Sequence, residues 1–321
     1  MSFKISVIIP TRSIDAYTKQ CIAECKKLDY KDYEILVVCD KQISEEIPGV
    51  KLIPAGDLLP GVKKNIGVRY STGEICAFID SDAFPKKDWL KKAANCFQNE
   101  DIAAVGGPNL TPGKDTISQK LSGLVLSSPL ACGKFSTRYK ISHPYFPVEL
   151  PSCNLIVKKH IIEKVNGFAP DFLTAEDADL CFKISQLNKK IFYSPEVIVF
   201  HHRRHLFIPY FKQIFTYGRD KSSLLRKIPI RQRFSKMCYF FIPSVFFLII
   251  FCVIGSFFII KIRIFILTII FLYLFLLLTE SLRLKTRYFH ALFLGLLGTH
   301  VSYLLGFLNA SLGKTGINFR K

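Results

Sequence analysis

The chain has 321 residues, of which 50% are hydrophobic, and it carries a formal net charge of +19 with a mean hydropathy of +0.26. With 13% aromatic and only 21% charged residues, it has enough apolar surface to fold, which excludes a disordered protein. Its ten cysteines follow no paired pattern and no signal peptide precedes them, so we expect a reducing cytoplasm rather than a secreted disulfide scaffold.

Short apolar runs alternate with helical segments over the first 79 residues. We predict helices at Ala16–Leu28 and Pro60–Tyr70 and strands at Ile5–Pro10, Glu34–Asp40, Val50–Ile53 and Glu74–Ile79. This alternation predicts an α/β fold with a doubly wound, mostly parallel sheet. Ligands bind outside the carboxyl ends of such strands, which points to the polar residues just beyond them: Thr11, Asp40, Asp80 and Asp82.

The last of these strands runs directly into two acids, Asp80 and Asp82. Two carboxylates at i and i+2 beside a buried strand repel each other unless a cation joins them. Mg²⁺ or Mn²⁺ prefers such oxygen ligands, often shared with phosphates. The alternative is a solvated turn in which Asp82 caps a helix around Trp89.

Three acids, Glu176, Asp177 and Asp179, open a further predicted helix. The helix dipole favours acids at this end, which is the purely structural explanation. A carboxylate on a rigid element facing the cleft would also suit a general base that deprotonates a hydroxyl.

A later apolar run, Val197–Phe200, ends in His201 and His202. Successive strand residues point to opposite faces, so one of the two at most faces the cleft. We take His202 as a candidate third metal ligand, the alternative being surface histidines near an anionic membrane.

Three long apolar segments follow, at 237–260, 264–282 and 288–312, each long enough to cross a bilayer. Only one of the 25 acidic residues, Glu280, lies beyond residue 236. In the third segment Gly298, Ser302, Gly306 and Ala310 recur every four residues, which favours close helix packing over a substrate channel.

The segment 206–236 mixes aromatic and basic residues, and we predict an amphipathic collar on an anionic membrane surface. Its bases beside the first apolar segment place the large N-terminal part, 1–205, on the cytoplasmic side of the inner membrane. The bases sit next to a membrane anchor, so we expect no nucleic acid as partner. Within 237–321, three crossings or two crossings with an interfacial helix are both open.

The segment 111–150 is rich in Gly, Pro and Ser and shows little periodic pattern. It also carries several bases, among them Lys134 and Arg138. We expect an acceptor-binding region partly against the membrane, where these two bases meet a lipid phosphate.

The chain resembles the family-2 glycosyltransferases of the GT-A fold over about residues 2–217. The resemblance is carried by Ser6-Val7-Ile8-Ile9-Pro10-Thr11, Lys64-Asn65-Ile66-Gly67, Asp80-Ser81-Asp82, Ser152-Cys153-Asn154 and Glu176-Asp177-Ala178-Asp179-Leu180. Gly106-Gly107-Pro108-Asn109 and the apolar C-terminal segments are similar to members that make bacterial polysaccharides or glycolipids. The motif Gln-x-x-Arg-Trp of processive members is not found at Gln213, so we expect a single sugar transfer.

The resemblance implies a role for each matching residue. Asp177 would be the general base and Glu176 would orient the acceptor or the base. Asp82 with Asp80 would hold a divalent metal. The acceptor would meet Asn154 and Asp179, and the residues implied for the nucleotide-sugar donor are Thr11, Asp40, Lys64, Asn65 and Asp80.

These observations predict a membrane-anchored, inverting glycosyltransferase that uses a nucleotide-sugar donor, Mg²⁺ or Mn²⁺, and a lipid-linked or other glycan acceptor. Two alternatives are a sugar-phosphate nucleotidyltransferase and a catalytically inactive membrane scaffold. The first needs a Gly-rich loop after the first strand, whereas Thr11-Arg12-Ser13-Ile14-Asp15 contains no Gly. Intact Asp80, Asp82 and Asp177 argue against the second.

Overall fold

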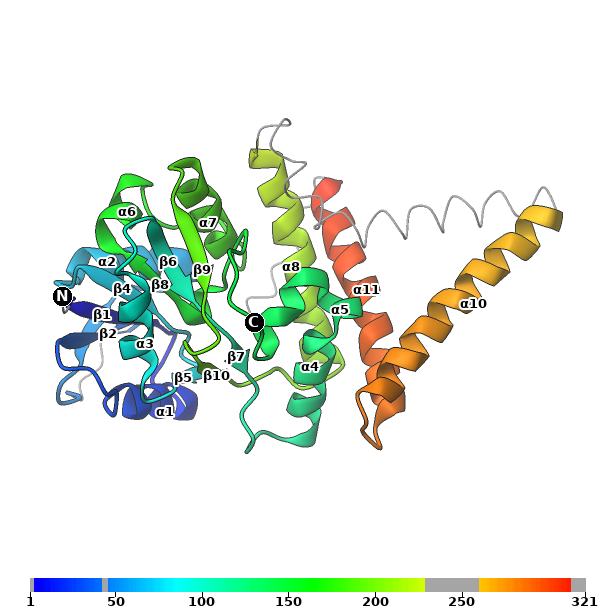
Figure 1. Cartoon of the computed structure of the whole chain (residues 1–321), viewed down its shortest axis with the longest axis horizontal. Coiled ribbons are helices and arrows are strands. Elements are labelled where there is room, and N and C mark those ends of the chain that lie inside the picture. The colour runs from blue at the N-terminus through cyan, green and yellow to red at the C-terminus, as the bar shows by residue number, and fades with distance from the viewer. Residues whose placement is uncertain (1–2, 42–45, 229–259, 313–321) are drawn as a thin grey trace. The chain divides into compact units, whose positions relative to one another are not determined.

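A computed structural model of the chain describes residues 3–41, 46–228 and 260–312 (Figure 1). Its main sheet has seven strands in the order β3-β2-β1-β4-β8-β6-β9. The strands are β1 (Ile5–Pro10), β2 (Tyr33–Cys39), β3 (Lys51–Pro54), β4 (Ile75–Phe78), β6 (Ile102–Gly106), β8 (Leu155–Lys158) and β9 (Lys190–Tyr193). Strand β8 runs antiparallel to both of its neighbours, and the other strand pairs are parallel. The predicted mostly parallel sheet is confirmed.

Helices cover both faces of this sheet. They are α1 (Ala16–Cys25), α2 (Pro60–Tyr70), α3 (Trp89–Cys96), α6 (Lys159–Lys164) and α7 (Glu176–Gln186). Strand β1 is buried on both faces, and its residues alternate between two cores. Ile5, Val7 and Ile9 pack in a cluster with residues of α1 and α3. Ile8 packs in the other cluster, with residues of α2, α6 and α7.

A second, three-stranded sheet has the order β5-β10-β7. It consists of β5 (Ala83–Pro85), β7 (Asn109–Leu110) and β10 (Val199–His201). Strand β5 begins directly after Asp82, and β10 runs antiparallel to it with His201 opposite Ala83. The small sheet therefore brings the end of the late apolar run beside the two acids that follow β4.

The chain divides into two compact units, one of Met1–Lys114 with Thr137–His202 and one of Asp115–Ser136 with Arg203–Lys321. The sequence predicted a single domain at 1–205, whereas in the structure the segment 115–136 belongs to the second unit. This segment forms α4 (Ile117–Ser127) and α5 (Pro129–Cys132), followed by 3₁₀ helices at Gly133–Tyr139 and Ser152–Asn154. The amide of Gln119 donates to the carbonyl of Arg203 at 2.9 Å, and Ser118 Oγ accepts from Leu206 N–H at 2.9 Å.

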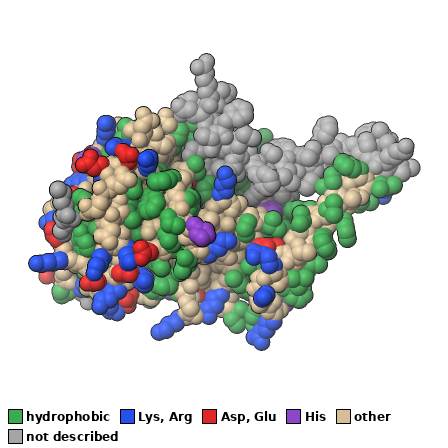
Figure 2. All heavy atoms as spheres, viewed as in Figure 1, with side chains coloured by type: hydrophobic (Ala, Val, Ile, Leu, Met, Phe, Trp, Pro, Cys, Tyr) green, Lys and Arg blue, Asp and Glu red, His purple; other side chains and the backbone are tan. Residues whose placement is uncertain are grey.

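Among its described residues, the second unit also contains the helices α8 (Ile208–Lys227), α10 (Ile260–Arg283) and α11 (Phe289–Ser311). By length and composition, Arg263–Arg283 and Phe289–Ser311 are each able to cross a membrane. They coincide with the second and third predicted apolar segments, and the first, 237–260, lies outside the described residues but for its last position. Exposed hydrophobic side chains cover α10 (Figure 2), including Phe271 and Leu276.

Helices α8 and α11 pack closely because glycines lie where their backbones meet. A Cβ added at Gly306 would collide with the carbonyl oxygen of Phe215, and one added at Gly218 would collide with that of Tyr303. Gly298 in turn faces the ring of Phe211. The predicted small-residue face of the third apolar segment is therefore confirmed as a packing surface, and its partner is α8.

Polar side chains of α10 and α11 form hydrogen bonds with residues at the start of α5. Glu280 accepts a hydrogen bond from Ser128 Oγ at 2.6 Å and pairs with Arg283 at 2.6 Å. His300 Nε2 lies 2.7 Å from the carbonyl oxygen of Leu130, and its Nδ1 lies 2.7 Å from Tyr273 Oη. Polar side chains in apolar helices need such partners, which explains why 115–136 belongs with these helices.

Candidate active site

Two acids and one histidine converge where β4 ends. Asp80, Asp82 and His201 each offer a ligand atom, and the three atoms lie within 4.8 Å of one another. His201 Nε2 is 3.1 Å from Asp82 Oδ1. The pairing of β10 with β5 creates this contact between residues far apart in the sequence.

This cluster has the charge and chemistry that suit a divalent cation. Burial raises the pKa of Asp80, and the neighbouring carboxylates of Asp82 and Asp177 add to that effect against the opposing charges of Lys64 and His201. Two carboxylates and an imidazole form a mixed oxygen and nitrogen set, which suits Mn²⁺ well and Mg²⁺ less well.

His201 balances the charge of Asp82. Burial lowers the pKa of His201, but the charge of Asp82 and the nearby thiol of Cys153 outweigh burial and raise it to about 10. The protonated imidazole therefore serves as the counter-charge of Asp82. Metal coordination by His201 would release this proton, since only neutral imidazole is a ligand.

His202 points away from this cluster. Its Nε2 lies 3.1 Å from Gln20 Oε1, and its ring centroid lies 4.5 Å from that of Tyr17. Its backbone reaches the site, where the N–H donates to the carbonyl oxygen of Asp82 at 2.9 Å. On this geometry His201, not His202, is the candidate ligand, because the two side chains leave the strand on opposite faces.

The N-terminus of α7 brings a second group of acids to the site. Asp177 Oδ2 accepts a hydrogen bond from Ser152 N–H at 3.2 Å, and its Oδ1 accepts from Ala178 N–H at 2.7 Å. Backbone donors and the helix dipole thus orient and stabilise this carboxylate.

Glu176 is buried and pairs with Lys64 at 2.7 Å. Burial lowers the pKa of Lys64, but Glu176, then Asp80 and Asp177, outweigh burial and raise it. Lys64 also donates to Ser152 Oγ. One buried cation therefore lies among the acids of both groups.

Asn65, the second predicted donor contact on α2, is tied to the backbone. Its Nδ2 donates to the carbonyl oxygen of Phe168 at 2.8 Å, and its Oδ1 accepts from Phe168 N–H at 2.8 Å. The preceding Gly167 has a φ of 67°, and a Cβ there would collide with the Asn65 side chain. Asn65 thus holds a glycine turn.

The two tentative acceptor residues also have protein partners. Asn154 is fully buried, where its Oδ1 accepts from Trp89 Nε1 at 2.9 Å and its Nδ2 donates to the carbonyls of Pro108 and Val197. Asp179 pairs with Lys183 at 2.7 Å.

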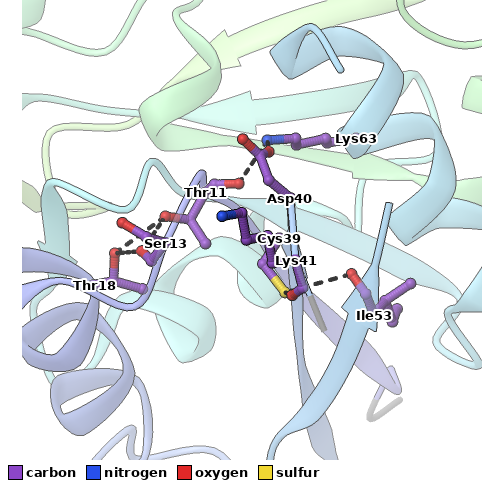
Figure 3. A network of polar contacts seen from close by, with 8 residues as sticks. All are labelled: Thr11, Ser13, Thr18, Cys39, Asp40, Lys41, Ile53 and Lys63. Atoms are coloured by element: carbon purple, nitrogen blue, oxygen red, sulfur yellow. Dashed lines mark hydrogen bonds and ion pairs between the residues drawn. The ribbon is translucent and has the colours of Figure 1, made fainter. Parts of the chain in front are cut away.

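Thr11 and Asp40 meet at the ends of β1 and β2 through a lysine that sequence reasoning missed (Figure 3). Lys63 Nζ donates to the carbonyl oxygen of Thr11 at 2.6 Å and pairs with Asp40. Thr11 Oγ1 donates to Ser13 O at 2.8 Å. The two adjacent lysines could have revealed the role of Lys63. Side chains at adjacent helix positions point about 100° apart, so Lys63 and Lys64 reach two different groups of residues.

Arg138, expected at a lipid phosphate, is buried instead. It pairs with Glu149 at 2.8 Å, and the two residues flank the loop 139–148. Lys134 lies on the second unit.

Comparison with known proteins identifies the family of the catalytic domain. The family model for Glycosyl transferase family 2 matches residues 6–160. A dolichyl N-acetyl-alpha-D-glucosaminyl phosphate 3-beta-D-2,3-diacetamido-2,3-dideoxy-beta-D-glucuronosyltransferase of Methanococcus voltae is 23% identical over 247 residues, covering 70% of this chain and 74% of that protein. Glycosyltransferase AglE of Haloferax volcanii is 21% identical over 249 residues, covering 72% of this chain and 78% of that protein.

A solved structure with a similar fold is the mannosyltransferase PcManGT from Pyrobaculum calidifontis, in complex with GDP-Man and Mn²⁺. The TM-score is 0.64 at 14% identity, over 98% of this chain and 88% of that one. The chain therefore contains a family-2 glycosyltransferase domain with the GT-A fold, which the family model places at residues 6–160.

Proposed function

We propose that this enzyme is anchored in a membrane and moves a sugar from a nucleotide-sugar donor to a membrane-associated acceptor with inversion. The acceptor is a lipid-linked sugar or a polysaccharide precursor. The observation that carries the proposal is the convergence of Asp80, Asp82 and His201 beside an acid group that includes Asp177. Support also comes from PcManGT, which is described with GDP-Man and Mn²⁺, and from a relative named for a dolichyl phosphate substrate.

The metal and donor groups lie at the carboxyl ends of the parallel strands. Asp80, Asp82 and His201 would hold the divalent cation, which supplies charge stabilisation to the departing nucleoside diphosphate. Thr11 and Asp40, held by Lys63, would contact the nucleoside. Lys64, on α2, would support the donor by its charge, whereas the side chain of Asn65 is already bonded to the backbone of Phe168.

Asp177 would act as general base. Its carboxylate takes the proton of the acceptor hydroxyl as that oxygen bonds to the anomeric carbon, while the bond from that carbon to the diphosphate oxygen breaks. One such displacement inverts the configuration at the anomeric carbon. Ser152 N–H keeps Asp177 Oδ2 aimed, and Glu176, already paired with Lys64, is a positioning residue.

The membrane location rests on two helices that are long and apolar enough to cross a bilayer. The predicted orientation, with the catalytic unit in the cytoplasm and several crossings, follows from the basic residues that precede the apolar segments. Anionic lipid would balance part of the +19 charge.

The test is turnover of UDP-, GDP- and dTDP-sugars with Mn²⁺ by the full chain and by Asp82→Ala, Asp177→Asn and Asp29→Asn. Asp29 is exposed and serves as the matched control. We expect both site variants to lose about 100-fold or more in rate, and the control to match the unmodified enzyme. Equal turnover in all four proteins would overturn the site assignment. Release of pyrophosphate from a nucleoside triphosphate and a sugar phosphate would instead favour the nucleotidyltransferase alternative.

A further inference from the structure

A loop of the first unit, residues 139–148, is held rigidly at its base. Arg138 and Glu149 flank it and form a buried ion pair at 2.8 Å. Tyr145 pairs antiparallel with Tyr193 of β9, through N–H···O contacts of 3.3 and 2.9 Å. Tyr193 Oη also donates to the carbonyl oxygen of Lys140 at 3.0 Å. The loop thus continues the edge of the main sheet.

The loop exposes three large apolar side chains, which together we call the tip. Ile141 is 63% exposed, Phe146 is 59% exposed and Val148 is 44% exposed. The ring of Phe146 is tilted by 49° against that of Phe192, with 5.4 Å between the ring centroids. Single exposed apolar residues are common, but three on one short, anchored loop are typical of a contact surface.

The surface around this tip is basic. Lys140 lies on the loop, and Lys190 Nζ lies 5.8 Å from the centroid of the Phe146 ring. Lys158 and Lys189 both donate to the carbonyl oxygen of Glu100 at 3.4 Å, and the charge of Lys189 adds to burial in lowering the pKa of Lys158. One of these four lysines, Lys190, pairs with an acid, Asp101, at 3.1 Å. The balance of charge favours an anionic partner.

We propose that the tip formed by Ile141, Phe146 and Val148 inserts into the interface of an anionic lipid bilayer, with the surrounding lysines on lipid headgroups. An apolar tip ringed by lysines matches that interface, where apolar side chains enter below the headgroups and ammonium groups stay among them. The proposal rests on the membrane location in the proposed function. It adds a bilayer contact made by the catalytic unit itself.

Tryptophan fluorescence of the full chain in proteoliposomes tests this contact. The chain has one tryptophan, Trp89, which is fully buried and gives a constant background. Phe146→Trp and Val148→Trp report on the tip, and Tyr70→Trp, at a residue 52% exposed elsewhere on the first unit, is the matched control. Leu276→Trp, on α10, reports on the membrane location itself. Turnover of the nucleotide sugar shows that each variant is folded.

Brominated lipids should quench both tip variants, and shallow bromines more than deep ones, because interfacial groups insert only about 5–10 Å. Replacing the anionic lipid by neutral lipid, or introducing Lys140→Glu with Lys189→Glu, should reduce that quenching. Tyr70→Trp should show no more quenching than Trp89 alone.

Three results would overturn the proposal. Quenching of Leu276→Trp with none of the tip variants would leave the membrane location standing and remove the tip contact. If no variant is quenched, both the membrane location and the tip contact are rejected. A blue shift at the tip that grows with protein density, without quenching, would assign the surface to a second copy of the chain.

Discussion

Lys63 and Lys64 show how much a single helix position decides. Lys63 joins Thr11 and Asp40 at the strand ends, whereas Lys64 is enclosed by Glu176 and the site acids. The sequence resemblance named only Lys64, and only as a donor contact. Its buried pairing with Glu176 adds a structural role, because a buried carboxylate without a cation is costly.

Replacing Lys64 by Met should destabilise the enzyme strongly, by about 3–5 kcal/mol, because Glu176 stays buried without its partner. The measurement is the melting temperature in detergent or bilayer. Lys86→Met, at an exposed pair with Asp88, is the control and should change stability by less than about 0.5 kcal/mol. Adding Glu176→Leu to Lys64→Met should restore much of the loss, and a double variant no better than the single one would contradict this account.

Glu34 makes stability depend on pH in a defined direction. Burial raises the pKa of Glu34, but hydrogen bonds from Ser6 Oγ at 2.6 Å and from Thr72 N–H and Oγ1 at 2.6 and 2.7 Å outweigh burial, so the pKa is lowered. A carboxyl with a lowered pKa stabilises the fold above its unfolded value of 4.5, and that stability is lost as pH falls through the folded pKa.

Glu34→Gln should therefore melt below the parent enzyme at neutral pH, with a loss of about 1 kcal/mol because the site is partly exposed to solvent. The gap should close as pH falls below 4.5. Parallel melting curves across pH measure it. A gap that stays constant with pH would mean that packing, and not charge, is responsible.

At the level of elements, the crossing of α8 and α11 depends on glycines that leave no room for a side chain. The two apolar helices were foreseen from composition, but composition does not show which helix lies against their small residues. In the structure that helix is α8, so the predicted collar has one face buried through Tyr210, Ile214 and Leu224.

Gly306→Leu should therefore disrupt this crossing, because its side chain meets the backbone of Phe215, and overpacking of this kind costs about 1–3 kcal/mol or more. Val301→Leu, at an exposed position of the same helix, is the matched control. Faster proteolysis within α8 measures the effect. If both variants resist the protease as the parent does, the close crossing does not contribute to stability.

At the scale of the whole molecule, the proposed metal site depends on residues that only folding brings together. Asp82 and His201 are 119 positions apart, and the small sheet brings them to 3.1 Å. The same folding places Asp177, from α7, close enough for its charge to affect Asp80.

Removal of divalent metal by a chelator should abolish sugar transfer, and Mn²⁺ should restore it at lower concentration than Mg²⁺, since imidazole suits Mn²⁺ better. His201→Gln should raise the Mn²⁺ concentration for half-maximal rate by about 10-fold or more, while His202→Gln should leave it unchanged. Titration of rate against each metal measures this. Equal shifts in the two variants would reject His201 as the ligand.

The elements themselves followed from local pattern. Apolar runs of strand length between helical segments predicted β1 to β4 and helices α1 and α2 within a few residues, since a strand buried on both faces has a continuous apolar sequence. The acids after β4 and at the start of α7 stood out for the same local reason. They are charged groups directly beside apolar runs.

The tertiary structure decided where the side chains point and which residues they contact. His201 rather than His202 faces the acids, Asn154 is enclosed by Trp89 and two carbonyls, and 115–136 joins the second unit. Each outcome depends on contacts between residues distant in sequence, which periodicity does not encode. The sequence by itself determined the kind of sheet and which acids to suspect, because these depend on local apolar pattern. Only the folded chain decided which side chains meet, because that depends on strand register and helix packing.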